Sequence, residues 1–134
     1  MQRLKVKTHK KREVVDLTDR LQQVVEKSYG GSSGFCQLSV LHTTAALTTA
    51  DLDPGTDLDM LDAFEHWIPK LRYRHPHDPD HVPDHILSAV IGTSVAIPVA
   101  RGALVLGTWQ RVVLVEFDGP RDREIVVGLT AEAA

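Results

Sequence analysis

Four of the seven histidines of this chain fall between Tyr73 and Gly92, interspersed with aspartates and prolines. The histidines are His75, His77, His81 and His85, and the aspartates are Asp78, Asp80 and Asp84. Imidazole and carboxylate groups bind divalent metals and move protons near neutral pH. Three prolines, Pro76, Pro79 and Pro83, disfavour a regular helix or central strand in the first half. The sequence therefore predicts a stiff polar loop that leads into a short apolar helix.

The spacing of these histidines permits metal binding without requiring it. His81 and His85 are four residues apart and share a face if a helix begins at Pro83 or one turn earlier. His75 and His77 form a second close pair, but neither pair has the specificity of a His-Glu-x-x-His helix. Surface or structural roles for these side chains remain the alternative.

A further histidine, His42, ends a segment that alternates like a strand. In the predicted strand from Phe35 to Thr44, Cys36, Leu38 and Val40 share one face. Continued alternation places His42 on the buried side at the end of the strand. It is then either a core histidine with its hydrogen bonds satisfied or a ligand aimed into a pocket.

The elements that must position these side chains follow from hydrophobic periodicity. Short strands around Leu4–Val6 and Val14–Val15 suggest a hairpin, and Thr18 is the expected N-cap of a helix over residues 18–29. A second helix is expected over 56–71, with Trp67 and Leu71 in its core stripe. A third is expected to begin at Pro83 and end at Gly92. A β-meander should follow, with strands at 94–100, 103–106, 111–117 and 124–129.

This pattern predicts an α+β fold in one domain of residues 1–134, with helices inserted between β segments and enough strands for two packed, mostly antiparallel sheets. Gly107 is a candidate bulge that would re-aim Thr108 and Gln110. Trp109 is expected in the core, with an interface anchor or a pocket wall as alternatives. Arg121, beside a tight turn, either binds an anion through two hydrogen bonds or is a solvated turn residue.

Composition narrows the classes of function. The net charge of -3 gives no broad basic surface for nucleic acid, and the basic run Lys5–Arg12 is expected to be a solvated strand edge. The single cysteine, Cys36, excludes an intrachain disulfide and fits a reducing compartment. The first residues contain no apolar signal region and no stretch is long and apolar enough for a membrane span. We expect a cytoplasmic protein with no nucleic-acid or membrane partner.

Four ordered pieces of the chain resemble the YjbQ family, often labelled secondary thiamine-phosphate synthase. Each piece alone is weak, but all four occur in order with matching gaps across nearly the whole chain. They are His42-Thr43-Thr44-Ala45; Tyr73-Arg74-His75 followed by Pro83-Asp84-His85-Ile86; Gly92-x-Ser94 with Ile97-Pro98; and Leu106-Gly107-Thr108-Trp109-Gln110 followed by Glu116-Phe117-Asp118-Gly119-Pro120-Arg121. One departure follows the first piece, where family members commonly carry an Asn-Glu pair and this chain has Ala50-Asp51.

The resemblance implies a β-sandwich with flanking helices, assembled as a homotrimer with a pocket between subunits. It places His42, His75 and His85 at the centre of that pocket. His77 and His81 match no fixed position of the family, so we interpret them as rim or loop residues. A site of three histidines with an open position is also how a catalytic metal is often held, so a divalent metal, zinc or magnesium, is the expected cofactor. Asp51 would orient one of the histidines.

The activity that the resemblance implies is thiamine-phosphate synthesis, in which a pyrimidine diphosphate and a thiazole phosphate are joined. A small phosphorylated substrate is therefore expected, with Arg121, Thr108, Gln110 and backbone N–H groups near Gly92 and Gly107 binding its anionic groups. His42, His75, His85 and Asp51 would carry the chemistry. Two alternatives use the same residues: a metal-dependent phosphoester hydrolase, and a non-catalytic trimer that binds a small anion.

Overall fold

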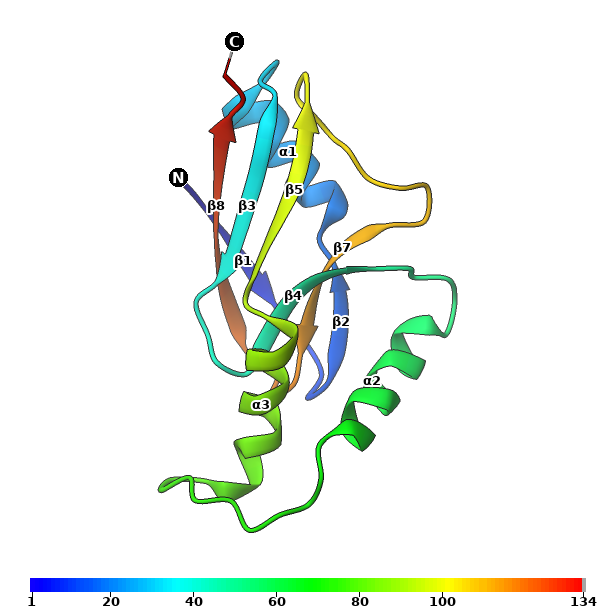
Figure 1. Ribbon diagram of the computed structural model, residues 1–134, viewed down its shortest axis with the longest axis vertical. Coiled ribbons are helices and arrows are strands. Elements are labelled where there is room, and N and C mark those ends of the chain that lie inside the picture. Colours follow the sequence, from blue (N-terminus) through cyan, green and yellow to red (C-terminus); the bar gives the residue numbers. More distant parts are fainter. Residues whose placement is uncertain (134) are drawn as a thin grey trace.

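The computed structural model describes residues 1–133 as eight strands and three α-helices, with one short 3-10 helix (Figure 1). The order is β1 (Gln2–Lys7), β2 (Glu13–Asp16), α1 (Thr18–Tyr29), β3 (Gly34–Val40), β4 (Ala45–Ala50), α2 (Thr56–Trp67), η1 (Pro79–His81), α3 (Val82–Ile91), β5 (Ser94–Ala100), β6 (Ala103–Leu104), β7 (Arg111–Glu116) and β8 (Asp122–Ala131).

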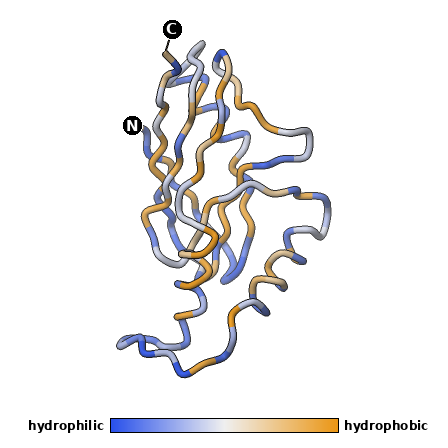
Figure 2. Tube along the Cα trace, in the orientation of Figure 1, coloured by the Kyte–Doolittle hydropathy of each residue, from blue (hydrophilic) through white to orange (hydrophobic). Residues whose placement is uncertain are grey.

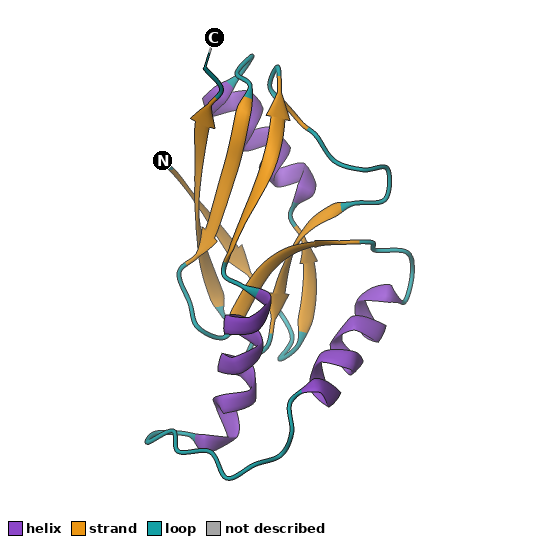
Figure 3. Ribbon diagram, in the orientation of Figure 1, coloured by secondary structure: helices purple, strands orange, loops and turns teal. Residues whose placement is uncertain are grey.

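The strands form two antiparallel sheets (Figure 3). One sheet has the order β1-β8-β3-β5-β6 and the other has the order β2-β7-β4. The two sheets with inserted helices confirm the predicted α+β class.

The three-stranded sheet is buried on both faces, which explains the unbroken apolar run of β7. Val112 and Leu114 pack toward the five-stranded sheet and α1, in the cluster that contains Leu38 and Ile125. Val113, Val115 and Phe117 pack on the other side, against a group from α2 and α3 that includes Leu61, Phe64 and Leu87. Alternate side chains of one strand therefore serve two separate cores.

Helices α2 and α3 lie beyond the three-stranded sheet, and the segment that joins them forms the far end of the molecule (Figure 1). This segment is mostly hydrophilic, as the sequence predicted for the histidine loop (Figure 2). None of the helices within residues 1–133 is long and apolar enough to cross a lipid bilayer.

Two predicted strand pairings are wrong. β1 and β2 do not form a hairpin, because β1 pairs with β8 in one sheet and β2 pairs with β7 in the other. The C-terminal strands do not form a meander either, because β7 and β8 lie in different sheets and β5 pairs with β3 and β6. Alternation identifies a strand and its buried face but says nothing about its partner.

Several local predictions also need correction. Thr18 is the first helical residue and not the N-cap: Asp16 Oδ1 accepts hydrogen bonds from its backbone N–H and its hydroxyl. Helix α2 ends at Trp67, and Trp67 and Leu71 are exposed. The core prediction for Trp109 is wrong, since its side chain is 70% exposed. Gly107 lies in a turn before β7 and not in a bulge.

Candidate functional site

A polar hollow of about 350 Å³ opens where the loop after β3, the start of α3 and the turn after β7 meet. Histidine, arginine and threonine side chains dominate its wall. The lining residues are Leu41, His42, Thr43, Thr44, His81, His85, Asp118, Arg121 and Arg123. Segments far apart in sequence thus converge on one small volume, and we call this hollow the histidine pocket.

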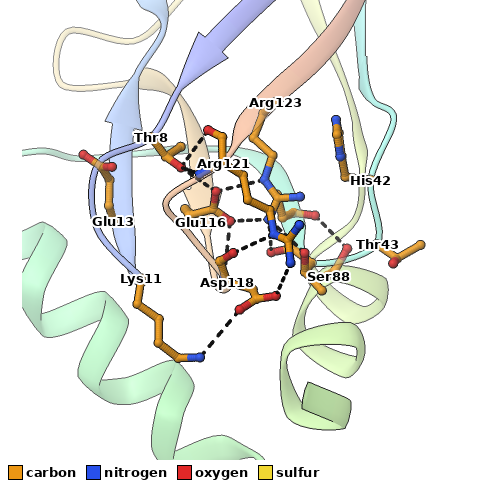
Figure 4. A network of polar contacts seen from close by, with 12 residues as sticks. Thr8, Lys11, Glu13, His42, Thr43, Ser88, Glu116, Asp118, Arg121 and Arg123 are labelled. Atoms are coloured by element: carbon orange, nitrogen blue, oxygen red, sulfur yellow. Dashed lines mark hydrogen bonds and ion pairs between the residues drawn. The ribbon is translucent and has the colours of Figure 1, made fainter. Parts of the chain in front are cut away.

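A buried ion pair forms the base of the histidine pocket (Figure 4). Arg123 and Glu116 are 1% and 0% exposed, and the Arg123 guanidinium donates to both carboxylate oxygens of Glu116. Arg123 also donates to the backbone carbonyl and hydroxyl of Thr44, while Glu116 accepts from the Thr8 hydroxyl at 2.7 Å. Because a buried charge without partners is very costly, these contacts hold the segments around the pocket in fixed positions.

Asp118 follows β7 and presents its carboxylate to the pocket. Arg121 donates to this carboxylate through Nη2 at 2.9 Å and to the Asp118 backbone carbonyl through Nε at 2.8 Å. Burial alone would raise the pKa of Asp118, but the Arg121 hydrogen bond and the nearby charges of Arg121 and Lys11 hold it below its ordinary value. Asp118 is therefore ionised at neutral pH, and it positions the half-exposed Arg121 side chain at the mouth of the pocket.

His42 has a fixed tautomer. The backbone N–H of Glu124 donates to His42 Nε2 at 3.0 Å, so the proton of the neutral ring is on Nδ1. Burial and the charge of Arg123 lower the pKa of His42, which keeps the ring neutral near pH 7. The sequence placed His42 at a strand end, but β3 ends at Val40 and the ring lies in the loop that follows.

His75 and His85 stack on one another, with ring centroids 5.1 Å apart and ring planes 16° from parallel. His85 Nδ1 lies 3.1 Å from the Thr43 carbonyl oxygen; since a carbonyl only accepts, Nδ1 carries the proton and Nε2 has an open lone pair. His75 Nδ1 instead accepts from the backbone N–H of Asp78 at 3.0 Å. The three histidines of the prediction therefore gather on one side of the molecule, with different hydrogen-bonding states.

These states do not fit a metal held by His42, His75 and His85. A metal ligand needs an open nitrogen lone pair, and only His85 Nε2 offers one. The accepting nitrogens of His42 and His75 are occupied by backbone N–H groups, and their other nitrogens carry protons. The donor chemistry of this set therefore suits hydrogen bonding to a substrate better than metal coordination.

The other predicted site residues lie away from the histidine pocket. Asp51 and Thr108 line a second hollow of about 310 Å³ with Asp16, Leu52, Asp53, Trp109 and Arg111. Strand β4 separates the two hollows, and its six residues span about 17 Å at the usual strand rise. Within one chain, Asp51 and Thr108 cannot share a small ligand with His42.

The predicted backbone donors are already engaged. The N–H of Gly92 donates to the Ser88 carbonyl at 3.0 Å, and the N–H of Gly107 donates to the Gln110 side chain at 3.0 Å. Gln110 also donates to the Thr49 hydroxyl. Gly92 and Gly107 therefore serve the local fold, as the end of α3 and the turn before β7.

Sequence reasoning missed three functional candidates, His81, Asp84 and Asp118. It left His81 on the rim and assigned no role to the two aspartates, yet one ligand atom from each residue lies within 4.8 Å of the others. The i,i+3 spacing of His81 and Asp84 could have indicated that their side chains share one face of a helix. Nothing local linked that pair to Asp118, which is brought there by the pairing of β7 with β4.

A larger hollow of about 600 Å³ lies beneath the segment that joins α2 and α3, lined by Lys70, Leu71, Arg72, Tyr73, Pro79, Asp80 and Pro83. It contains none of the histidines. We therefore place the candidate chemistry in the histidine pocket.

Comparison with known proteins identifies the family. The family model described as UPF0047 protein YjbQ-like matches residues 2–132. A UPF0047 protein of Archaeoglobus fulgidus is 36% identical over 125 residues, which cover 92% of this chain and 96% of that protein. The UPF0047 protein YugU of Bacillus subtilis is 34% identical over 121 residues, covering 90% and 91%.

Solved structures of YjbQ-like proteins support the same family assignment. The crystal structure of a YbjQ-like protein of unknown function from Sulfolobus solfataricus superposes with a TM-score of 0.89 at 35% identity, covering 98% of this chain and 96% of that one. A yjbq/upf0047 family protein from Clostridium acetobutylicum gives a TM-score of 0.86 at 31% identity, covering 97% and 100%. The chain belongs to the UPF0047 family of YjbQ-like proteins.

Proposed function

We propose that this protein is a transferase of the thiamine-phosphate synthase type, which joins a pyrimidine diphosphate to a thiazole phosphate. The observation that carries the proposal is the convergence of His42, His85 and Arg121 on one polar hollow of about 350 Å³. The choice of substrates comes from the resemblance to the family, and the assignment of roles comes from the geometry of the pocket.

The reaction needs groups that stabilise a leaving diphosphate. The bond between the pyrimidine methylene carbon and the diphosphate oxygen breaks, and its electron pair leaves with the diphosphate. The thiazole nitrogen supplies the lone pair for the new C–N bond, and this exchange of bonds needs no proton transfer; the released diphosphate then takes up a proton from water. Catalysis then consists of orienting two rings and stabilising negative charge.

Arg121 and His42 suit the leaving diphosphate. Two Arg121 nitrogens hold Asp118, and the third, Nη1, makes no hydrogen bond within residues 1–133. His42 is neutral and carries its proton on Nδ1, so it offers a hydrogen bond in a fixed orientation without needing to titrate. Hydrogen-bond donors that are already in position lower the reaction barrier most when they face the atoms on which negative charge develops in the transition state.

His85 suits the pyrimidine ring. Its Nε2 lone pair is an acceptor, and the amino group of an aminopyrimidine is a donor. His75 stacks on one face of the His85 imidazole and fixes the plane of that ring. We assign His85 to orientation of the ring and His75 to support of His85.

Assembly as a homotrimer would complete the site. The second hollow, with Asp51 and Thr108, is about 17 Å from the histidine pocket along β4. In a trimer, the second hollow of one subunit would face the histidine pocket of its neighbour, and Trp109, 70% exposed, would be covered there. The buried cysteine is consistent with work in a reducing cytoplasm.

The test is rescue of a bacterial strain that lacks its own thiamine-phosphate synthase, followed by an assay of the purified protein. We expect the wild type and His77→Ala to restore growth and His42→Ala to fail while it remains folded by circular dichroism. Pyrophosphate release that needs both precursors supports the transferase. Release from the pyrimidine diphosphate alone would favour the hydrolase, and binding of pyrophosphate without turnover of either precursor would favour the anion-binding trimer.

A further inference from the structure

Three side chains at the edge of the histidine pocket form a cluster of metal-ligating groups. His81 ends η1, Asp84 lies in the first turn of α3, and Asp118 follows β7. One ligand atom from each lies within 4.8 Å of the other two. This mixed set of one nitrogen and two carboxylates is separate from the histidines that the family resemblance singled out.

The orientation of His81 leaves one ring nitrogen facing Asp118. Its Nε2 lies 3.2 Å from Asp78 Oδ2, and its Nδ1 lies 3.4 Å from Asp118 Oδ2. When Nε2, beside the Asp78 carboxylate, carries the proton of the neutral ring, Nδ1 has a lone pair close to the Asp118 carboxylate. Two lone pairs that face each other need a proton or a cation between them. A histidine that binds a metal through one ring nitrogen usually donates the N–H of its other ring nitrogen to a carboxylate or a backbone carbonyl.

The buried Asp84 carboxylate and the partly buried Arg12 guanidinium have few hydrogen-bond partners. Asp84 is 2% exposed, and within residues 1–133 its carboxylate accepts a single long hydrogen bond of 3.4 Å, from Arg12 Nη2. Arg12 Nη1 is also buried and makes no hydrogen bond within residues 1–133. A cation would satisfy Asp84, and an anion beside it would satisfy Arg12.

The surrounding charges decide how such an ion is bound. Lys11 lies 3.6 Å from Asp118, Arg12 lies 3.4 Å from Asp84, and Arg121 lies 2.9 Å from Asp118. Three positive side chains already neutralise two carboxylates, so a divalent ion alone would add excess positive charge. A phosphate group in the adjacent pocket would remove that excess.

We infer that His81, Asp84 and Asp118 bind a divalent cation together with a phosphate-bearing ligand in the histidine pocket. The phosphate-bearing ligand in this inference rests on the proposed function, whereas the three metal ligands follow from the structure of the cluster. Two carboxylate oxygens, one imidazole and remaining positions for water and phosphate suit magnesium or manganese. In this arrangement the cation bridges the protein and the diphosphate, and Arg12 and Arg121 bind the outer phosphate oxygens.

The experiment is a Mn²⁺ titration followed by electron paramagnetic resonance, without and with inorganic pyrophosphate. We expect pyrophosphate to raise the affinity of the wild type for Mn²⁺ by about 10-fold or more. Asp84→Asn and His81→Ala should each lower the affinity measured with pyrophosphate by more than about 10-fold, and Asp78→Asn by roughly 10-fold or more. Asp80→Asn, the same change at an exposed neighbour, should leave it unchanged. His81 is only half-buried, so His81→Ala provides the test if Asp84→Asn fails to fold.

Pulsed spectra of the bound Mn²⁺ should show coupling to one imidazole nitrogen that disappears in His81→Ala. Equal binding by the wild type, Asp84→Asn and His81→Ala, or an imidazole coupling lost in His85→Ala instead, would overturn the inference. The two proposals fail separately. Mn²⁺ and pyrophosphate would still bind at these residues if the transferase reaction were absent, and transfer would persist in Asp84→Asn if the cation site were wrong.

Discussion

The backbone N–H of Glu124 donates to Nε2 of His42 over 3.0 Å, and this contact decides what His42 can do. It places the proton of the neutral ring on Nδ1 and removes the accepting nitrogen from metal coordination. His42, which the resemblance to the family places in a metal site, thereby becomes a hydrogen-bond donor.

The same contact predicts how His42 affects stability. Its pKa is lower in the folded state, because of burial and Arg123, than in the unfolded chain. The unfolded state therefore binds more protons, and stability falls as pH drops through about 6.5, the ordinary histidine pKa, toward the folded-state value. Urea denaturation at pH 7.5 and 5.5 should show a smaller loss in His42→Gln than in the wild type. An equal loss in both proteins would show that His42 is not the group responsible.

The Arg123–Glu116 pair should be essential for folding. Arg123→Met leaves a fully buried Glu116 charge without its partner, so the free energy of unfolding should fall by about 3–5 kcal/mol. The double variant Arg123→Met/Glu116→Leu should recover part of this loss. Arg3→Met, which removes an exposed ion pair with Glu124, is the matched control and should change stability little. Similar effects of the two single variants in urea denaturation would contradict this reading.

The sequence predicted the elements better than their arrangement. The boundaries of α1 and β5 were correct, because amphipathic periodicity is local. The hairpin was wrong, because β1 finds its partner in β8, at the other end of the chain, and no local pattern records that choice. Trp67 and Trp109 follow patterns typical of core residues but are exposed.

The candidate site was predictable where residue type agreed with the resemblance to the family. His42, His85 and Arg121 were identified, and all three line one pocket. The states of the rings were not predictable, since they depend on backbone groups such as the N–H of Glu124 and the carbonyl of Thr43. The basic run was read as a solvated edge. Lys5 and Lys7 do lie exposed on edge strand β1, but Lys11 and Arg12 reach Asp118 and Asp84.

Gly119 should be intolerant of a side chain. A Cβ there would collide with the Lys10 backbone carbonyl and would lie 2.9 Å from Glu116 Cγ. Gly119→Ala should therefore destabilise the fold by about 1–3 kcal/mol and disturb the turn that carries Asp118 and Arg121. Gly128→Ala is the control, because its Cβ would meet only the Met1 side chain at 3.7 Å. Thermal unfolding of the two variants makes the comparison, and equal melting temperatures would contradict the close packing of this turn.

Mixed subunits should restore activity if the pocket is shared. We expect His42→Ala and Asp51→Ala each to abolish rescue of the thiamine-requiring strain when expressed alone. Co-expression should restore part of the growth, because the proposed trimer, when mixed, would contain contacts where an intact histidine pocket meets an intact second hollow. The two variants should also co-purify through a tag on one of them. Co-purification without any restored growth would place the two hollows at separate sites.

The central claim is that the histidine pocket binds a phosphate group through His42 and Arg121. Histidine and arginine side-chain ¹H–¹⁵N spectra, recorded while inorganic pyrophosphate is added, test it directly. The account predicts a His42 ring protonated on Nδ1 before addition, with saturable shifts of the His42 and Arg121 signals and none for His77. A His42 ring protonated on Nε2, or pyrophosphate binding that leaves His42 and Arg121 unmoved, would contradict it.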